Sequence, residues 1–344
     1  MNIIGCERSA PPRRSGQGSI LVFTVWVIFI LTIFAMTLAG IVSDRIFFAQ
    51  GYRERAQAYI AACSGINQAI AEIKKDTQAN NYDTLNELWC SNAELFNNQP
   101  IGSAFFSISF NWTDGGISYG MHDEESSINI NTASQKVLET LFKNRYDLLT
   151  PSEAESIANA IIDWRDEDSN ERQGGAENNY YQSLSNPYPC KNKPFDFIEE
   201  LLLVKGITDD IYDKVRDIIT VYGDGRVNIN TASGAVFMAL GLSDELANKV
   251  IRYRNGPDET RQTEDDRSFV EMSSIVSVIN QAIPLTSDES QALNNLVATN
   301  AIITKSNHFR IQIKGFTGAA DDPKNSRTIT CIIKRNGKIL YWNE

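Results

Sequence analysis

A chain of 344 residues is long enough for two or three modules, and its 42% hydrophobic and 22% charged residues are ordinary for a globular protein. This composition excludes a wholly disordered chain. The formal net charge of -11 opposes binding to a polyanion such as nucleic acid, because the sequence has no obvious basic cluster.

An uncharged apolar segment lies near the N-terminus. Ser19–Val42 holds 24 residues without a charged side chain, and Arg13 and Arg14 precede it. As a helix rising about 1.5 Å per residue, this segment would span about 36 Å, which exceeds a hydrocarbon core of about 30 Å. The preceding arginines indicate a cytoplasmic N-terminus and an exported remainder. A cleaved secretory signal is the alternative, but its apolar region would be unusually long.

Apolar residues continue beyond this segment at helical spacing. From Tyr52 to Ile73 they recur every three or four residues, which predicts an amphipathic helix. The two segments together predict one helix from about Ser19 to about Lys75. Its first half is apolar on every side, and we expect its second half to pack on its own domain.

Strand-like segments flank a long helical block at roughly 123–300. Alternating apolar residues before and after the block, together with Gly-rich turns, predict β-hairpins. A helical insertion within a sheet domain is the economical explanation of this order. The predicted strands are Ala104–Trp112, Ile117–Met121, His308–Lys314, Thr328–Lys334 and Lys338–Trp342, with Asn336 and Gly337 as a hairpin turn.

The sequence NINTAS occurs twice in the helical block, at Asn129–Ser134 and Asn228–Ser233. IANAIIDWRD at residues 157–166 later matches LANKVIRYRN at residues 246–255. These matches occur in the same order and predict duplication of a small multi-helix unit. Thr132 and Gln135 have the spacing of a helix capping box. The simplest structural role of NINTAS is a buried turn whose Asn side chains bind backbone groups.

NINTAS followed by a helix ending in an aromatic residue and Arg resembles a helix-hairpin-helix unit. Two such units, a pilin-like N-terminus, GGAENNYYQSL and FDFIEELLLVKGIT together resemble the general secretion pathway protein K family. These are the large minor pseudopilins of type II secretion. The resemblance covers nearly all of the chain after Arg13. It implies an α+β fold in which a long N-terminal helix packs on a small antiparallel sheet, interrupted by an inserted all-α domain of two helix-hairpin-helix units.

The resemblance also implies a domain order and a processing site. We expect a prepilin leader at 1–18, a transmembrane part at 19–42, a pilin-like domain at 43–122 and 301–344, and the inserted domain at 123–300. Prepilin peptidase would cleave between Gly18 and Ser19. The fifth mature position, which carries Glu in typical pilins, is Phe23 here. A lipid-buried carboxylate is costly unless it pairs with a neighbouring subunit's terminal ammonium, so we expect a subunit lacking it to occupy the tip.

The expected function is therefore assembly and not catalysis. The family implies an inner-membrane protein with its C-terminal bulk in the periplasm, which initiates and caps the pseudopilus. Its partners would be the minor pseudopilins I and J, with H and the major pseudopilin G below them. The sequence leaves open whether the cap contacts the secretin, an exported substrate or only its sister subunits. No nucleic-acid partner is expected.

An acidic stretch follows the first helical match. DWRDEDSNERQGGAE, at residues 163–177, holds six carboxylates against two arginines, and oxygen ligands gathered in a loop suit calcium. The resemblance to the protein K family also implies calcium binding in this region. A solvated acidic loop is the alternative. The expected calcium ligands are Asp163, Asp166, Asp168, Glu171 and Glu177. A second acidic cluster at Asp258–Asp266 is more readily explained as solvated.

Four cysteines follow the apolar segment, in a compartment where we expect oxidising conditions. They are Cys63, Cys90, Cys190 and Cys331. Disulfide bonds among them would have three alternative pairings, which the sequence leaves open, and four unpaired thiols are the alternative. The absence of a CxxC spacing argues against zinc.

Two other functions fit parts of the sequence. A membrane-anchored DNA receptor of the competence type would use its helical hairpins, with Lys249, Arg252 and Arg254 as cations. The equivalent turns, Phe142–Arg145 and Leu240–Asp244, lack the Gly-x-Gly that lets backbone amides approach a phosphate. A hydrolytic or metal site at His122 and the three following acids is less expected than a polar lead into the first NINTAS turn.

Overall fold

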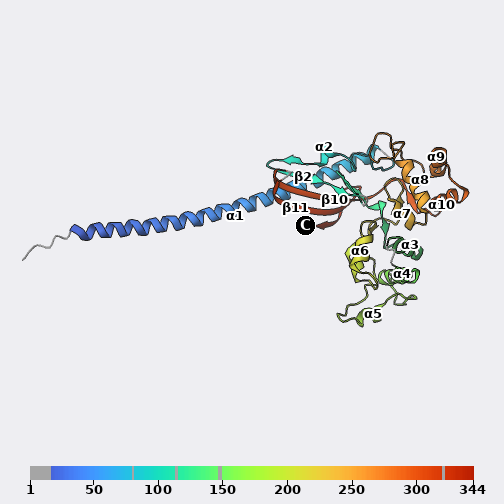
Figure 1. Cartoon of the computed structure of the whole chain (residues 1–344), viewed down its shortest axis with the longest axis horizontal. Coiled ribbons are helices and arrows are strands. Elements are labelled where there is room, and N and C mark those ends of the chain that lie inside the picture. The colour runs from blue at the N-terminus through green and yellow to red at the C-terminus, as the bar shows by residue number, and fades with distance from the viewer. Residues whose placement is uncertain (1–16, 80, 113–114, 146–148, 320–321) are drawn as a thin grey trace, which may run out of the picture. The chain divides into compact units, whose positions relative to one another are not determined.

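The computed structural model describes residues 17–79, 81–112, 115–145, 149–319 and 322–344 (Figure 1). The chain divides into two compact units, Met1–Ala56 and Gln57–Glu344. Each unit is described by itself.

The described part of the first unit is the N-terminal portion of helix α1, which runs Gln17–Ala79. This confirms the helix predicted from about Ser19 to about Lys75. The helix is long and apolar enough to cross a membrane, and its apolar stretch is not buried by the rest of the chain. Phe23 lies in this stretch with 69% of its surface exposed. Such a surface in water would be costly, so it requires lipid or other apolar helices around it.

In the second unit, the remainder of α1 packs on an antiparallel sheet (Figure 1). The strand order is β1-β2-β10-β11-β12, and the short strand β5 also pairs with β10. A Cβ atom at Gly315 of β10 would collide with the backbone of Ala58 in α1, so the missing side chain lets helix and strand approach closely. The strands are β1 (Gln99–Ile101), β2 (Ala104–Ile108), β5 (His122–Asp123), β10 (His308–Ala319), β11 (Asp322–Lys334) and β12 (Ile339–Asn343).

The predicted hairpins are present. Strands β3 (Phe110–Asn111) and β4 (Ile117–Ser118) pair antiparallel. Between β11 and β12, Gly337 has a φ of 87°, a left-handed conformation that favours glycine at this turn. The long run predicted at Ala104–Trp112 is divided into β2 and β3. The short helix α2 (Ala93–Phe96) precedes the sheet.

The helical block consists of two units of similar construction. In the first, strand β6 (Ile128–Asn129) pairs parallel with β7 (Ile219–Thr220), and the 3-10 turn η1 (Glu124–Ser126) leads into it. Between the two strands lie helices and one 3-10 segment. They are α3 (Gln135–Arg145), α4 (Pro151–Arg165), α5 (Asn178–Gln182), η2 (Ile198–Leu203) and α6 (Asp209–Val215).

In the second unit, β8 (Val227–Asn228) pairs parallel with β9 (Ile302–Ile303). Each unit therefore begins with its NINTAS segment and closes by returning a short strand beside it. The elements between these strands are α7 (Gly234–Ala239), α8 (Asp244–Arg254), η3 (Met272–Ser274), α9 (Ile275–Ala282) and α10 (Ser287–Ala298).

The same arginine contact occurs in both units. Arg165, the last residue of α4, donates to the carbonyls of Ile130 and Ala133, with 2.6 Å to the latter. Arg254, the last residue of α8, donates to the carbonyls of Ile229 and Ala232 at 3.1 and 2.6 Å. Each arginine thus ties the end of its helix to the preceding NINTAS turn, which explains why both sequence matches recur in the same order.

The NINTAS turn begins its helix differently from the expected capping box. The N–H of Val137 donates to the Ser134 hydroxyl at 3.4 Å, so Ser134 precedes the first turn of α3. The Thr132 hydroxyl instead donates weakly to the carbonyl of Asn129 at 3.4 Å. The prediction that Thr132 and Gln135 form the cap was therefore wrong, because α3 begins only at Gln135.

Two separate hydrophobic clusters hold these parts. One consists of residues from α1, the strands of the large sheet and the loops between them, including Trp89, Phe106 and Phe309. The other consists of residues from both helical units, including Phe142 and Phe237. The chain is thus an α+β protein in which a helical insertion with its own core interrupts a helix-and-sheet domain, as predicted.

Candidate functional site

The acidic loop lies between α4 and α5. Helix α4 begins with a capping box in which Thr150 and Glu153 exchange side-chain and backbone hydrogen bonds, with Pro151 in its first turn. It ends at Arg165, and Glu177 directly precedes α5. The helix therefore delivers Asp163 and Asp166 to one end of the loop, and Glu177 closes the other end.

Asp163 shapes this loop from inside. Its carboxylate is fully buried, and one oxygen accepts from the backbone N–H groups of Ala176 and Arg172 at 2.9 and 3.2 Å. A side chain at Gly175 would collide with that same oxygen. Burial raises the pKa of Asp163 above its ordinary value. Asp163 therefore organises the loop backbone.

Three other carboxylates converge in the loop. Asp166, Asp168 and Glu177 each offer an oxygen within 4.8 Å of the other two. Glu177 is only 3% exposed, and neither of its carboxylate oxygens has a hydrogen-bond partner. One oxygen of Asp166 is also buried without a partner. Burial, followed by neighbouring negative charge, raises the pKa of both Glu177 and Asp166. Buried acceptors of this kind are costly unless a cation or proton satisfies them.

Asn192 is a candidate oxygen donor that the sequence did not indicate. Its amide donates to the backbone carbonyl of Asp168 at 2.6 Å, which places it beside the carboxylate group. Its side-chain oxygen is buried without a partner, as is that of Asn159 in α4. Both residues lie outside the acidic stretch at 163–177, so the pattern of that stretch does not predict them as ligands. Glu171 is exposed and does not belong to the converging group.

Other acidic clusters have donors supplied by the protein. Arg335 pairs with Asp76 at 2.7 Å and also with Asp83. In the cluster at 258–266, Asp265 and Asp266 accept from the N–H groups of Asp258 and Gln262 at 3.1 and 2.8 Å. Asp166 and Glu177 differ because buried oxygens of both have no hydrogen-bond partner, whereas Asp168 is exposed and accepts from the N–H of Asn170 at 2.7 Å.

The four cysteines are free thiols in this structure, which forms no disulfide among them. Cys90 and Cys331 are buried in the core of the sheet domain, and Cys63 packs against that core. Cys190 lies beside the acidic loop, with its sulfur 3.8 Å from the backbone carbonyl of Asp163. Burial raises the pKa of Cys190 to about 11, so it is a thiol at neutral pH.

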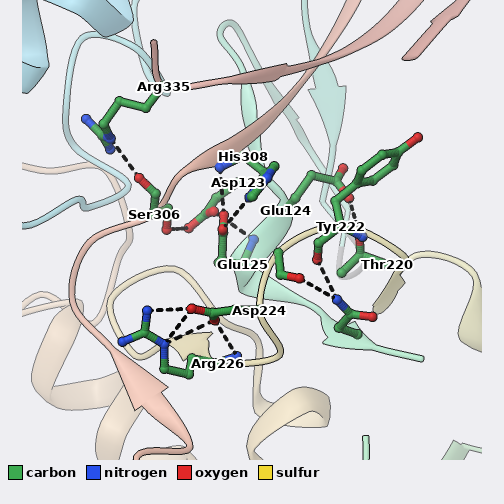
Figure 2. A network of polar contacts seen from close by, with 12 residues as sticks. Asp123, Glu124, Glu125, Thr220, Tyr222, Asp224, Arg226, Ser306, His308 and Arg335 are labelled. Carbon is green, nitrogen blue, oxygen red and sulfur yellow. Dashed lines mark hydrogen bonds and ion pairs between the residues drawn. The ribbon is translucent and has the colours of Figure 1, made fainter. Parts of the chain in front are cut away.

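A buried polar network joins the sheet to the second helical unit. One carboxylate oxygen of Asp123 accepts from the hydroxyls of Thr231 and Ser306 at 2.5 and 2.7 Å and from the amide of Asn228 at 3.1 Å. Figure 2 shows Asp123 beside Ser306, with Glu124 and Glu125 next to it. Asn228 and Thr231 come from the second NINTAS segment, so that segment anchors its unit on the sheet.

The next two acids anchor the first unit. Glu124 binds Arg310 of β10 at 2.6 Å and accepts from the Thr220 hydroxyl of β7. Glu125 lies 2.7 Å from Nδ1 of His308 (Figure 2). Arg310 lowers the pKa of Glu124 despite its complete burial. The acids after His122 are thus structural contacts at the root of the insertion, in agreement with their interpretation as a polar lead into NINTAS.

The type II secretion system protein K family model matches residues 118–224, which include the root of the insertion and the whole acidic loop. The chain is 30% identical over 128 residues to type II secretion system protein K of Pectobacterium carotovorum subsp. carotovorum, covering 37% of this chain and 38% of that protein. It is 33% identical over 76 residues to a putative protein K of Escherichia coli K12, covering 22% and 23%. These alignments span well under half of either relative.

The fold extends the likeness to most of the chain. The structure matches a chain in the crystal structure of the GspK-GspI-GspJ complex from enterotoxigenic Escherichia coli with a TM-score of 0.64. The match covers 87% of this chain and 98% of that one, at 17% identity. At this identity, the structural match establishes a shared fold. The chain is thus similar to type II secretion system protein K over residues 118–224 by sequence, and over most of its length by fold.

The cations considered for DNA binding have partners within the chain. Lys249 binds Glu289 at 2.7 Å, and Arg252 binds Glu259 at 2.8 Å. Arg254 is buried and donates to the NINTAS turn. None of the three is free to neutralise a phosphate, so the geometry does not favour the DNA-receptor alternative.

The hairpin turns of the two helical units lie partly where expected. Leu240–Ser243 connects α7 to α8, and Gly241 has a φ of 95°. The turn predicted at Phe142–Arg145 was wrong, because these residues form the last turn of α3. Helix α4 begins at Pro151, and residues 146–148 lie outside the described residues. Gly18 and Ser19, on either side of the predicted cleavage site, lie in the first turn of α1. Residues 1–16 of the predicted leader lie outside the described residues.

Proposed function

We propose that this chain is a minor pseudopilin that occupies the tip of the type II secretion pseudopilus. The observation that carries this proposal is Phe23 in the exposed apolar part of α1. A pilin carboxylate at this position would receive the terminal ammonium of the subunit above. Phenylalanine offers no charge, so a further subunit gains no ion pair by joining above, whereas the amine of this chain can still be received from below.

The topology follows from the same helix. Prepilin peptidase would remove residues 1–18 by cleavage between Gly18 and Ser19, leaving α1 anchored in the inner membrane. Arginines before the apolar segment favour retention of the N-terminus in the cytoplasm, which places the sheet and the helical units in the periplasm. The protein then acts in assembly and does not need catalytic groups.

We propose the minor pseudopilins I and J as direct partners, joined through their N-terminal helices, with H and the major pseudopilin G below. The protein K relative of this fold was crystallised in a complex with GspI and GspJ, which supports the first two. The helical insertion is too bulky to repeat on every subunit of a shaft, which also favours a terminal position. From there it would face the secretin or the exported substrate.

We further propose that the acidic loop binds calcium through Asp166, Asp168 and Glu177. Calcium would satisfy the buried oxygens of Asp166 and Glu177 that have no hydrogen-bond partner, alongside Arg172, whose guanidinium lies 3.8 Å from the other oxygen of Asp166. Asp163 would hold the loop backbone in place behind them, and Asn192 would offer a neutral oxygen. The bound loop would then join the end of α4, the start of α5 and the segment around Asn192, stabilising the first helical unit.

The tip assignment is tested by co-expressing the full chain with minor pseudopilins I and J of its own secretion system. After detergent extraction, affinity purification of the tagged chain should recover both partners at about equal amounts. Labelled chain should be found once per pseudopilus, at its end. Repeated labelling along the shaft, or recovery of the chain without either partner, would overturn the proposal.

A further inference from the structure

A cavity of about 350 Å3 lies where the helical insertion meets the sheet. Its walls come from the sheet side, through β3, β5 and β10, and from the roots of both helical units. The residues relevant to binding are Trp112, His122, Arg216, Asp217, Ser233 and Arg310. The network of Asp123, Glu124 and Glu125 explains how the two parts are joined, and its partners Thr231 and Arg310 also line this cavity.

Two polar atoms in the cavity wall have no partner. Nδ1 of His122 and the hydroxyl oxygen of Ser233 are both buried without a hydrogen bond. Buried polar atoms in native proteins are nearly always satisfied by protein, water or ligand. Two orphans from different segments, β5 and the second NINTAS, facing one cavity indicate that something polar occupies it.

The charges of the cavity favour a small anion. Arg310 gives its Nε to Glu124 at 2.6 Å, and its two terminal nitrogens have no hydrogen-bond partner among the described residues. Arg216 is half-exposed and shares its charge with Asp213 at 3.2 Å and Asp217 at 4.0 Å. The lining therefore holds two guanidinium groups and one carboxylate, in a chain whose net charge is -11.

The shape of the donors distinguishes between anions. A guanidinium offers parallel N–H groups that match the two oxygens of a carboxylate. A phosphate carries up to two negative charges, and the nearby Asp217 and Glu124 would repel the second. Burial and the charge of Arg310 lower the pKa of His122 to about 4, so its imidazole is neutral near pH 7 and contributes hydrogen bonding without charge.

We propose that this cavity is a binding site for a carboxylate group, held by Arg216 and Arg310 with Ser233 as an additional donor. The carboxylate belongs either to an acidic residue of a partner protein or to a free small molecule. The site lies between the sheet and both helical units, so its ligand would contact the root of the whole insertion. The proposal does not depend on the tip position proposed above.

The test uses the full chain in detergent and two probes, sodium glutarate and the peptide acetyl-Gly-Glu-Gly-amide. Binding is followed by thermal unfolding at constant ionic strength and by the arginine Nε–Hε signals in NMR. We expect either probe to raise the unfolding temperature and to shift the Arg310 signal. The peptide acetyl-Gly-Gln-Gly-amide, which lacks the charge, should do neither.

Two variants examine the site directly. Arg216→Ala should weaken probe binding about tenfold, and Ser233→Ala about fivefold, as expected for a charged and a neutral hydrogen bond. Arg252→Ala is the matched control, because Arg252 is equally exposed and paired with an acid outside the cavity. Tighter binding of the peptide than of glutarate supports a protein ligand, and the reverse order supports a free small molecule. Equal binding to wild type and Arg216→Ala, or equal binding of the Gln peptide, would overturn the proposal.

Discussion

Asn230 and Phe269 are joined by two reciprocal hydrogen bonds. The Asn230 amide donates to the Phe269 carbonyl at 2.9 Å, and the Phe269 N–H donates to the Asn230 side-chain oxygen at 2.7 Å. In the first unit, Asn131 makes the same pair with Phe195, at 3.0 and 2.7 Å. The side chain of the last Asn in each NINTAS segment therefore makes the pair of hydrogen bonds that a neighbouring backbone would make. Its partner lies 64 residues later in the first unit and 39 residues later in the second.

Replacing this Asn should destabilise its unit. Asn230→Ala leaves the buried N–H and carbonyl of Phe269 without partners, which we expect to cost about 3 kcal/mol in the free energy of unfolding. Asn131→Ala should cost less, about 2 kcal/mol, because its site is only partly buried. Urea unfolding followed by circular dichroism measures both. Asn248→Ala, at an exposed position in α8, is the control and should change stability by less than about 0.5 kcal/mol.

The proposed calcium site makes a prediction with a control inside the same loop. Calcium at 100 times its dissociation constant should stabilise the folded protein by about 2.7 kcal/mol, and a chelator should reverse this. Glu177→Gln should abolish the calcium-dependent rise in the unfolding temperature. Glu171→Gln should retain it, since Glu171 is exposed and outside the converging group. An equal calcium response in both variants would contradict the assignment, and calorimetry provides the readout.

His122 should contribute a pH dependence to stability. Its pKa is lowered from 6.5 to about 4, chiefly by burial and also by the charge of Arg310. Between these values the unfolded chain binds a proton that the folded chain does not, so stability should fall as pH decreases from about 6.5 to about 4. The full loss attributable to His122 is about 3 kcal/mol.

The contribution of His122 has to be measured by comparing wild type with a variant, because other buried groups also titrate in this pH range. Burial raises the pKa of Glu87 to about 7, and its contribution runs in the opposite direction over an overlapping pH range. The stability of wild type should therefore be compared with that of His122→Gln at each pH by urea unfolding. The wild type should lose more stability on acidification than the variant. Parallel pH curves for the two proteins would show that His122 is not responsible.

The loop after α8 fastens the second helical unit to the hairpin of β3 and β4. The guanidinium of Arg261 lies 4.4 Å from the ring centroid of Trp112 and donates to the carbonyl of Gly115 at 3.1 Å. Arg261→Ala removes this cation–π contact, which we expect to be worth about 1 kcal/mol of stabilising free energy. The variant should therefore show faster amide hydrogen exchange in residues 255–268. Arg226→Ala should leave that exchange unchanged, because Arg226 pairs with Asp224 outside this loop. Similar exchange in wild type and Arg261→Ala would mean that other contacts hold the loop.

The tip proposal predicts a gain of function at one position. Phe23→Glu restores the carboxylate on which an upper neighbour depends, so we expect this variant to appear within the shaft as well as at its end. Labelling and electron microscopy of sheared pseudopili would count copies per fibre. Phe23→Leu keeps an apolar side chain and should remain terminal. Confinement of both variants to the end would show that the helical insertion, and not this side chain, sets the position.

Local sequence patterns were sufficient to predict the long helix, the strands of the sheet and the presence of two related helical units. The uncharged stretch after Gly18 determined the apolar helix, since no short-range feature opposes it, and alternation with Gly turns determined the strands of the sheet. The repeated NINTAS determined that two related units exist. Features of this kind depend on neighbours a few residues away, which a sequence displays directly.

Only the tertiary structure decided which side chains meet. It brought Asp166, Asp168 and Glu177 together, added Asn192 and left Glu171 in solvent, although all four acids lie in one stretch of sequence. It also engaged Arg254 in an internal turn and placed Arg216 and Arg310 around one cavity. These outcomes depend on burial and on contacts between segments about a hundred residues apart, so no pattern of spacing within a segment contains them.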